Sequence, residues 1–150
     1  MRVQPYMRQG KEGSLEELLA KVKDFHGHLG PFAALGVKLS LAGLRKLGAK
    51  RGDTSLQAVV ELPELKTPYT CIVDGVQVAT GCTVGNGRLK VVRGENFGFK
   101  LRLEGGEIGF KVAREAIEWM ENELKAGKPM EEVARRLLDV ADSQVFTELG

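Results

Sequence analysis

PFAALGVKLSLAGLRKLG, residues 31–48, is the stretch of this chain on which the architecture most depends. Its first residue is proline, which suits the first turn of a helix, and Gly48 is a residue at which a helix readily ends. Apolar side chains occupy most faces of the helix that this pattern predicts, and a helix of that kind is buried. We therefore expect residues 31–48 to form a central helix.

The segments around this helix predict further helices and strands. SLEELLAKVKDF, residues 14–25, begins with the capping-box pair Ser14 and Glu17 and predicts an amphipathic helix. YTCIVDGVQVAT, residues 69–80, is helix or strand by periodicity alone. Further strands are expected over residues 55–65, 88–94, 97–105 and 106–112. Further helices are expected over residues 112–127 and 128–146. The order of these elements along the chain, with helices first, then strands, then helices, indicates an α+β fold.

Composition narrows the classes of protein. The chain has 150 residues and 43% hydrophobic residues, as expected for one globular domain, and its net charge of +2 gives no reason to expect a nucleic acid partner. No apolar run approaches the roughly 20 residues that span a bilayer, and the N-terminus does not resemble a signal peptide, so we expect a soluble, cytoplasmic protein. Many charged residues beside few Asn and Gln favour an archaeal or thermophilic source.

FHGHLGP, residues 25–31, holds the only two histidines, His26 and His28, on either side of Gly27. Residues two apart on a helix point about 200° apart, so both imidazoles can bind one ion only where the segment is extended or looped. Gly27 and Pro31 favour a loop, and imidazole is the commonest side-chain metal ligand. The alternative is one histidine that packs or caps a turn and one that faces solvent.

Cys71 and Cys82 lie in TPYTCIVDGVQVATGCTVGNGRLK, residues 67–90. In a reducing cytosol, such a pair is better interpreted as free thiols or metal ligands than as a disulfide. A disulfide is the alternative if the source is a hyperthermophile. If the segment between them is helical, Cys71 and Asp74 share one face. Cys82 would lie roughly 16 Å farther along the axis, so a shared ion requires a turn at Gly81. The alternative is that both are small buried hydrophobes.

GCTVGNGR, residues 81–88, does not match the phosphate-binding loop G-x-x-x-x-G-K-[ST] and precedes a predicted strand. A nucleotide site is therefore not expected. Backbone amides in the turn around Gly85 can nevertheless form an anion-binding nest, with Thr83, Asn86 and Arg88 as further donors. A tight connection into the next strand explains the same residues equally well.

Taken together, FHGHLGPFAALGVKLSLAGLRKLG and CIVDGVQVATGCTVGNGRL resemble the FmdE family, the E-type subunits of formylmethanofuran dehydrogenase, whose members carry HGHxCPG and CxxDxxQxxTGCTxGKG segments. The resembling region runs from about residue 24 to residue 103, and a weaker similarity follows in LLDVADSQVFTEL near the end. Two separated motifs in the same order make the resemblance far more specific than either motif alone.

The resemblance implies an α+β fold with an antiparallel sheet packed by helices, often dimeric. It implies one domain over residues 1–150, without the C-terminal zinc ribbon that some members append. It also implies a metal-associated pocket built from the histidine loop and the cysteine segment. By position, the metal-binding residues are His26, His28, Cys71 and Cys82, and the ligand-binding residues are Asp74, Thr83, Gly85 and Asn86.

The chain departs from the family pattern at two positions. The cysteine of the first motif is Gly30 here, so one thiolate is missing, and the lysine of the second motif is Asn86. These departures leave two hypotheses open. The first is a protein that binds a divalent metal ion, zinc before nickel, cobalt or iron, and serves one-carbon or molybdenum or tungsten oxidoreductase metabolism. The second is a non-catalytic module that binds a small anion or an oxidoreductase partner.

The metal hypothesis predicts that His26, His28 and Cys82 converge on one pocket. Whether such a site would also catalyse a reaction is left open by the sequence. We further expect a symmetric homodimer, because the central helix and the alternating apolar strand at residues 97–103 offer more apolar surface than a small sheet covers.

Overall fold

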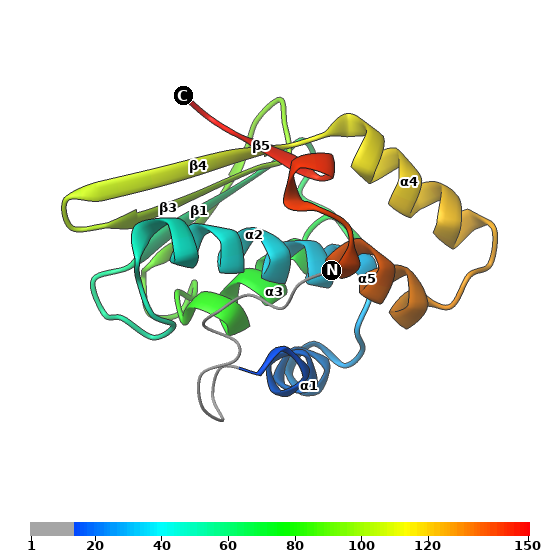
Figure 1. Ribbon diagram of the computed structural model, residues 1–150, viewed down its shortest axis with the longest axis horizontal. Coiled ribbons are helices and arrows are strands. Elements are labelled where there is room, and N and C mark those ends of the chain that lie inside the picture. The colour runs from blue at the N-terminus through cyan, green and yellow to red at the C-terminus, as the bar shows by residue number, and fades with distance from the viewer. Residues whose placement is uncertain (1–13) are drawn as a thin grey trace.

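The computed structural model describes residues 14–150, and Figure 1 shows one sheet with helices beneath it and beyond one of its ends. The helices are α1 (Leu15–His26), α2 (Pro31–Leu47), α3 (Cys71–Thr80), α4 (Arg114–Lys125) and α5 (Met130–Asp139), and a 3-10 turn, η3, spans Asp142–Gln144. The strands are β1 (Gln57–Leu62), β2 (Leu89–Arg93), β3 (Gly98–Leu103), β4 (Gly106–Val112) and β5 (Phe146–Glu148). The expected α+β class is confirmed.

The sheet has the strand order β2-β1-β3-β4-β5. Strands β1, β3, β4 and β5 pair antiparallel, as expected. The pair β1–β2 is parallel, which differs from the expected antiparallel sheet. The reason is the ambiguous segment at residues 69–80, which forms the helix α3 between these two strands, because a helical crossover returns the chain to run in the same direction.

Helix α2 is central, as its apolar pattern predicts. Every residue from Pro31 to Leu44 is buried, and α3 lies directly against it. The two helices approach through glycines: a Cβ on Gly36 would stand 2.2 Å from the carbonyl oxygen of Ile72, and one on Gly75 would stand 2.0 Å from that of Ala33. No larger residue fits at either position without moving a helix, so these glycines fix where α3 lies.

The C-terminal part departs from expectation. The helix expected over residues 128–146 ends at Asp139, and Phe146–Glu148 is instead a strand paired with β4. The buried Lys38 on α2 explains the early end, because its Nζ donates to the carbonyls of Leu138 at 3.2 Å and Val140 at 2.7 Å. It also pairs with Asp142. These contacts satisfy carbonyls that the ending helix leaves free.

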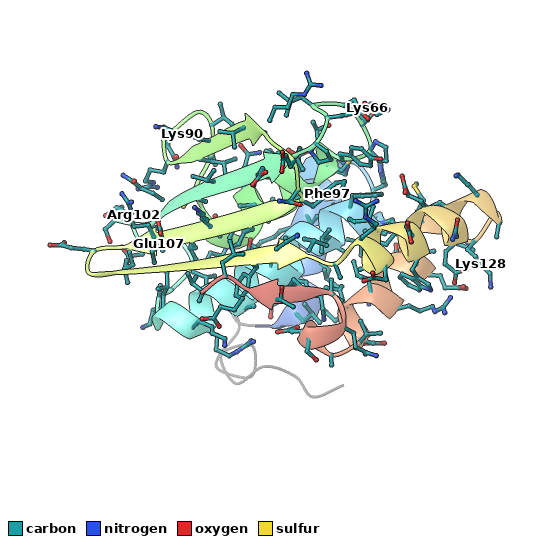
Figure 2. All side chains as sticks on the ribbon, turned by 90° about the horizontal axis from the view of Figure 1, so that it is seen from above. Lys66, Lys90, Phe97, Arg102, Glu107 and Lys128 are labelled. Carbon is teal, nitrogen blue, oxygen red and sulfur yellow. The ribbon has the colours of Figure 1, made fainter. Side chains whose placement is uncertain are left out.

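The face of the sheet turned away from α2 and α3 carries charged side chains. Figure 2 shows this face from above, with the labelled Lys90, Arg102 and Glu107 on β2, β3 and β4 and the helices behind. Phe99 and Leu101 of β3 point the other way and are buried. The apolar strand and the central helix on which the dimer expectation rests are thus covered within the chain. Among residues 14–150, no helix is long and apolar enough to cross a membrane.

Candidate functional site

The two histidines lie where the loop between α1 and α2 meets the first turn of α3. Gly27 ends α1 in the left-handed conformation (φ 102°), and its amide donates to the carbonyl of Lys23. The chain then runs extended through Gly30 (φ −108°, ψ 172°) into the proline that begins α2. This break brings the rings of His26 and His28 to a centroid distance of 4.7 Å. The histidine segment therefore has the looped form that a shared ion requires.

A carboxylate from α3 holds His26. Its Nδ1 lies 2.6 Å from Oδ2 of Asp74, and the His26 side chain is only 12% exposed. Because a carboxylate accepts, Nδ1 carries the proton, and in the neutral ring Nε2 then presents a lone pair. Within residues 14–150 that buried Nε2 has no hydrogen-bond partner. A buried polar atom without a partner is costly, and a metal ion or a ligand that donates would satisfy it.

Asp74 is fixed in turn by Gln77, one turn farther along α3. The Gln77 Nε2 donates to Oδ1 of Asp74 at 3.1 Å, and its Oε1 accepts the amide of Val84 at 3.0 Å. One side chain thus connects the histidine pocket to the glycine-rich loop. Sequence reasoning missed Gln77, although its spacing was a usable signal: Cys71, Asp74 and Gln77 follow one another by three and share a helix face.

We expect Gln77→Leu to lower the free energy of unfolding by about 1 kcal/mol, because one partly buried hydrogen bond to Asp74 and one exposed hydrogen bond to the Val84 amide are lost. The amide of Val84 loses its acceptor and should exchange with solvent faster. Hydrogen exchange and thermal unfolding measure both effects. The matched control is Gln57→Leu, which changes an exposed glutamine on β1. Equal exchange at Val84 in the two variants would show that Gln77 does not hold the loop.

A pocket of about 400 Å³ opens beside His26. It is lined by His26, Leu65, Thr67, Thr70, Cys71, Val73, Asp74 and Val91. Burial raises the pKa of the Cys71 thiol, and the nearby Asp74 carboxylate raises it further. Because the thiolate is the metal-binding form, Cys71 is a weak candidate ligand at neutral pH, although it belongs to the pocket wall.

Cys82 is not brought to the histidines. It follows the C-terminal end of α3, whose ten residues put it roughly 15 Å from the end that carries Asp74. The side chain is fully buried, and burial raises the pKa of its thiol. The expected convergence of His26, His28 and Cys82 therefore does not match the geometry, and Cys82 fits its alternative interpretation as a buried hydrophobe.

The glycine-rich loop is closed by its own side chains. Asn86 Oδ1 accepts the amides of Thr83 and Arg88, each at 3.0 Å, and Thr83 Oγ1 accepts the amide of Asn86 at 2.9 Å. Asn86 Nδ2 donates to the carbonyl of Gly81. Asn86 thus locks the turn around Gly85, and these amides are already used inside the loop rather than turned toward an anion.

The residues present fit a metal ion only in part. Within residues 14–150, no group of three or more His, Cys, Asp or Glu side chains could hold one ion, so the set His26, His28, Cys71 and Cys82 is not assembled. The rings of His26 and His28 lie close together, with centroids 4.7 Å apart, and an ion between them would need water or an added ligand to complete its coordination. A metal-binding histidine commonly donates its second ring nitrogen to a carboxylate, as His26 does to Asp74.

These features define an α+β protein with a histidine–carboxylate pair at the junction of α1, α2 and α3. Residues 25–147 match the family described as FmdE, molybdenum formylmethanofuran dehydrogenase operon. The chain belongs to this family, which confirms the resemblance inferred from the two motifs.

Known proteins similar to the chain include a curated relative and a solved structure. One is a probable S-adenosyl-L-methionine-binding protein of Archaeoglobus fulgidus. It is 32% identical over an alignment 150 residues long, which covers 93% of this chain. The chain spans only 39% of that relative's length. The other is a crystal structure of a tungsten formylmethanofuran dehydrogenase FmdE-like protein from Syntrophus aciditrophicus, with a TM-score of 0.67 and 21% identity. The match covers 99% of this chain and 77% of that one, and the likeness supports the fold.

Proposed function

We propose that the protein binds a metal ion between His26 and His28, with Asp74 as the residue that orients His26. The observation that carries the proposal is the buried Nε2 of His26, which has no hydrogen-bond partner among the described residues. The other ring nitrogen, Nδ1, lies 2.6 Å from the Asp74 carboxylate. Two protein ligands leave coordination positions for water or another molecule. Zinc is the first candidate, because borderline divalent ions accept imidazole.

The family suggests where such a site would serve. The matching family is described by the operon of a molybdenum formylmethanofuran dehydrogenase, so an accessory role beside a one-carbon oxidoreductase that uses molybdenum or tungsten is the proposed setting. Both thiols have raised pKa values, in each case chiefly because of burial. Since neither is an activated nucleophile, a binding role is favoured over covalent catalysis by cysteine.

Titration of metal-free, untagged protein with zinc tests this proposal. Wild-type protein should bind one ion per chain, and His26→Gln should bind none, because the amide cannot replace the imidazole Nε2. Cys82→Ser is the matched control, since that thiol lies at the other end of α3, and it should keep one ion per chain. Equal stoichiometry in wild type and His26→Gln would reject the site.

Gly30→Cys should strengthen zinc binding by at least about tenfold, because a thiolate is added beside an imidazole at an otherwise two-ligand site. The substitution is sterically permitted: the nearest atom to a Cβ on Gly30 is Cδ2 of His28, at 3.6 Å. Gly30→Ser is the control, with similar size and no sulfur. Isothermal titration of the two variants measures the difference, and equal zinc affinities would place the ion elsewhere.

Binding of S-adenosylmethionine is a second candidate function. The 32% identical relative is named as a probable binder of it, and the pocket of about 400 Å³ combines apolar walls with the Asp74 carboxylate. A carboxylate there would face a sulfonium cation favourably. Thermal shift assays with S-adenosylmethionine and with S-adenosylhomocysteine, which lacks the sulfonium charge, test this. Stabilisation by the cation that Asp74→Asn removes would support it, and no stabilisation by either compound would exclude it.

The homodimer also remains a proposal. Its support is now the set of exposed large hydrophobic side chains rather than the central helix and strand: Phe25, Leu65, Val84, Val92, Met130 and Leu149. Sedimentation velocity at high micromolar concentration should give twice the 16.4 kDa mass of the chain. A species with the single-chain mass would contradict this.

A further inference from the structure

Position 30 borders two potential donor atoms from different parts of the chain. A Cβ built on Gly30 would lie 3.8 Å from Nε2 of His28 and 3.8 Å from Sδ of Met130. The imidazole nitrogen and the thioether sulfur therefore both border the space that a side chain at position 30 would occupy. Donors of one metal ion lie about 2.0–2.3 Å from it, so a shared ion requires both side chains to rotate toward this space.

Helix α5, which Met130 begins, packs through the buried Val133, Ala134 and Leu137, and exposed ion pairs also join it to α1. Lys23, in the last turn of α1, pairs with Glu131 at 3.1 Å. Arg135 of α5 donates to both carboxylate oxygens of Glu16, at 2.9 and 3.1 Å. Met130 begins α5 directly before Glu131, and the residue is 45% exposed. The thioether thus lies near the histidine loop and is not part of the core.

The donor chemistry selects the kind of ion. We propose that Met130 supplies a thioether as the third ligand beside His26 and His28, and that this ligand lets the same site bind a soft monovalent cation of the Cu(I) class more tightly than zinc. Thioethers suit Cu(I), whereas zinc prefers imidazole, thiolate and carboxylate. Two neutral imidazoles and a neutral thioether also leave less uncompensated charge around a monovalent than around a divalent ion. This inference rests on the proposed metal site and adds its third ligand and its selectivity.

The test uses Ag(I) as a redox-stable soft probe and zinc as the borderline probe. Both are titrated into a Cys71→Ser background, so that the partly exposed thiol does not bind silver. One equivalent of Ag(I) should shift the ε-methyl NMR signal that Met130→Leu removes. Met130→Leu, which preserves size, should weaken Ag(I) binding at least about tenfold and change zinc affinity less than about threefold, because only the soft ion depends on the thioether.

Phe25→Leu is the matched control, because it alters an exposed apolar side chain next to His26 that carries no donor atom. It should leave both affinities unchanged. Ag(I) binding that His26→Gln abolishes but Met130→Leu does not weaken would overturn the role of Met130 and leave the proposed metal site standing. Failure of the background protein to bind either ion would refute the metal site, and this inference with it.

Discussion

Gly75→Ala is expected to lower the free energy of unfolding by about 3 kcal/mol, the upper part of the range for overpacked cores. The added Cβ would stand 2.0 Å from the carbonyl oxygen of Ala33, which is backbone and cannot rotate away. Helices α2 and α3 would have to separate, although alanine favours the helical conformation by roughly 1 kcal/mol. Because Asp74 precedes Gly75, the same movement should draw the carboxylate away from His26. Urea unfolding measures the loss.

Gly43→Ala is the matched control on α2. A Cβ there would meet side-chain atoms, Leu101 Cδ2 and Phe99 Cε2, both at 3.2 Å, and such neighbours yield more easily than backbone. The gain in helix propensity should offset most of the crowding, so the expected change is within about 1 kcal/mol. Equal stabilities of the two variants would show that the α2–α3 approach does not depend on glycine.

Asp74→Asn is expected to weaken metal binding by about 10- to 100-fold, the usual effect of removing the carboxylate behind a metal-binding histidine. The amide oxygen can still accept from Nδ1 of His26, but the negative charge is gone. The new amide nitrogen would also face Nε2 of Gln77, which now donates to Asp74. Gln77 must turn, and it then loses the amide of Val84. Zinc affinity and exchange at Val84 should therefore change together.

The control for this substitution is Asp24→Asn. Asp24 is exposed on the last turn of α1, two residues before His26, so the variant removes the same charge nearby without removing a hydrogen bond to the ring. Zinc affinity should change less than about threefold, because exposed charges are well screened by solvent. If both variants weakened zinc binding equally, the effect would be general electrostatics rather than the held imidazole.

Local patterns predict the elements that carry their own signals. Ser14 is the N-cap of α1 as expected, with its Oγ accepting the amide of Glu17 at 3.0 Å. The apolar stretch from Pro31 predicts the central helix, and the alternation of β3 predicts its buried face. The histidine loop is also predictable, because Gly27 and Pro31 interrupt the helices around it. These features depend on neighbours in sequence.

Features that depend on distant residues were not predictable in this way. The segment at residues 69–80 is helical because Gly75 lets it lie against α2, and its pattern alone does not reveal that partner. The early end of α5 depends on Lys38, which donates to the carbonyl of Leu138 and precedes that residue by 100 positions in the sequence. Cys82 was expected in the site because its motif resembles a ligand segment, yet α3 carries it away from the histidines.

The most direct measurement of the central claim is the protonation and metal response of the His26 ring nitrogens, followed by ¹⁵N NMR of the imidazoles during a zinc titration. In the neutral His26 ring of metal-free protein, the proton should be on Nδ1, bonded to Asp74, and not on Nε2. One equivalent of zinc should shift Nε2 of His26 together with a nitrogen of His28. A proton on Nε2 of His26 in the neutral ring, or ring nitrogens that do not respond to zinc, would contradict the account.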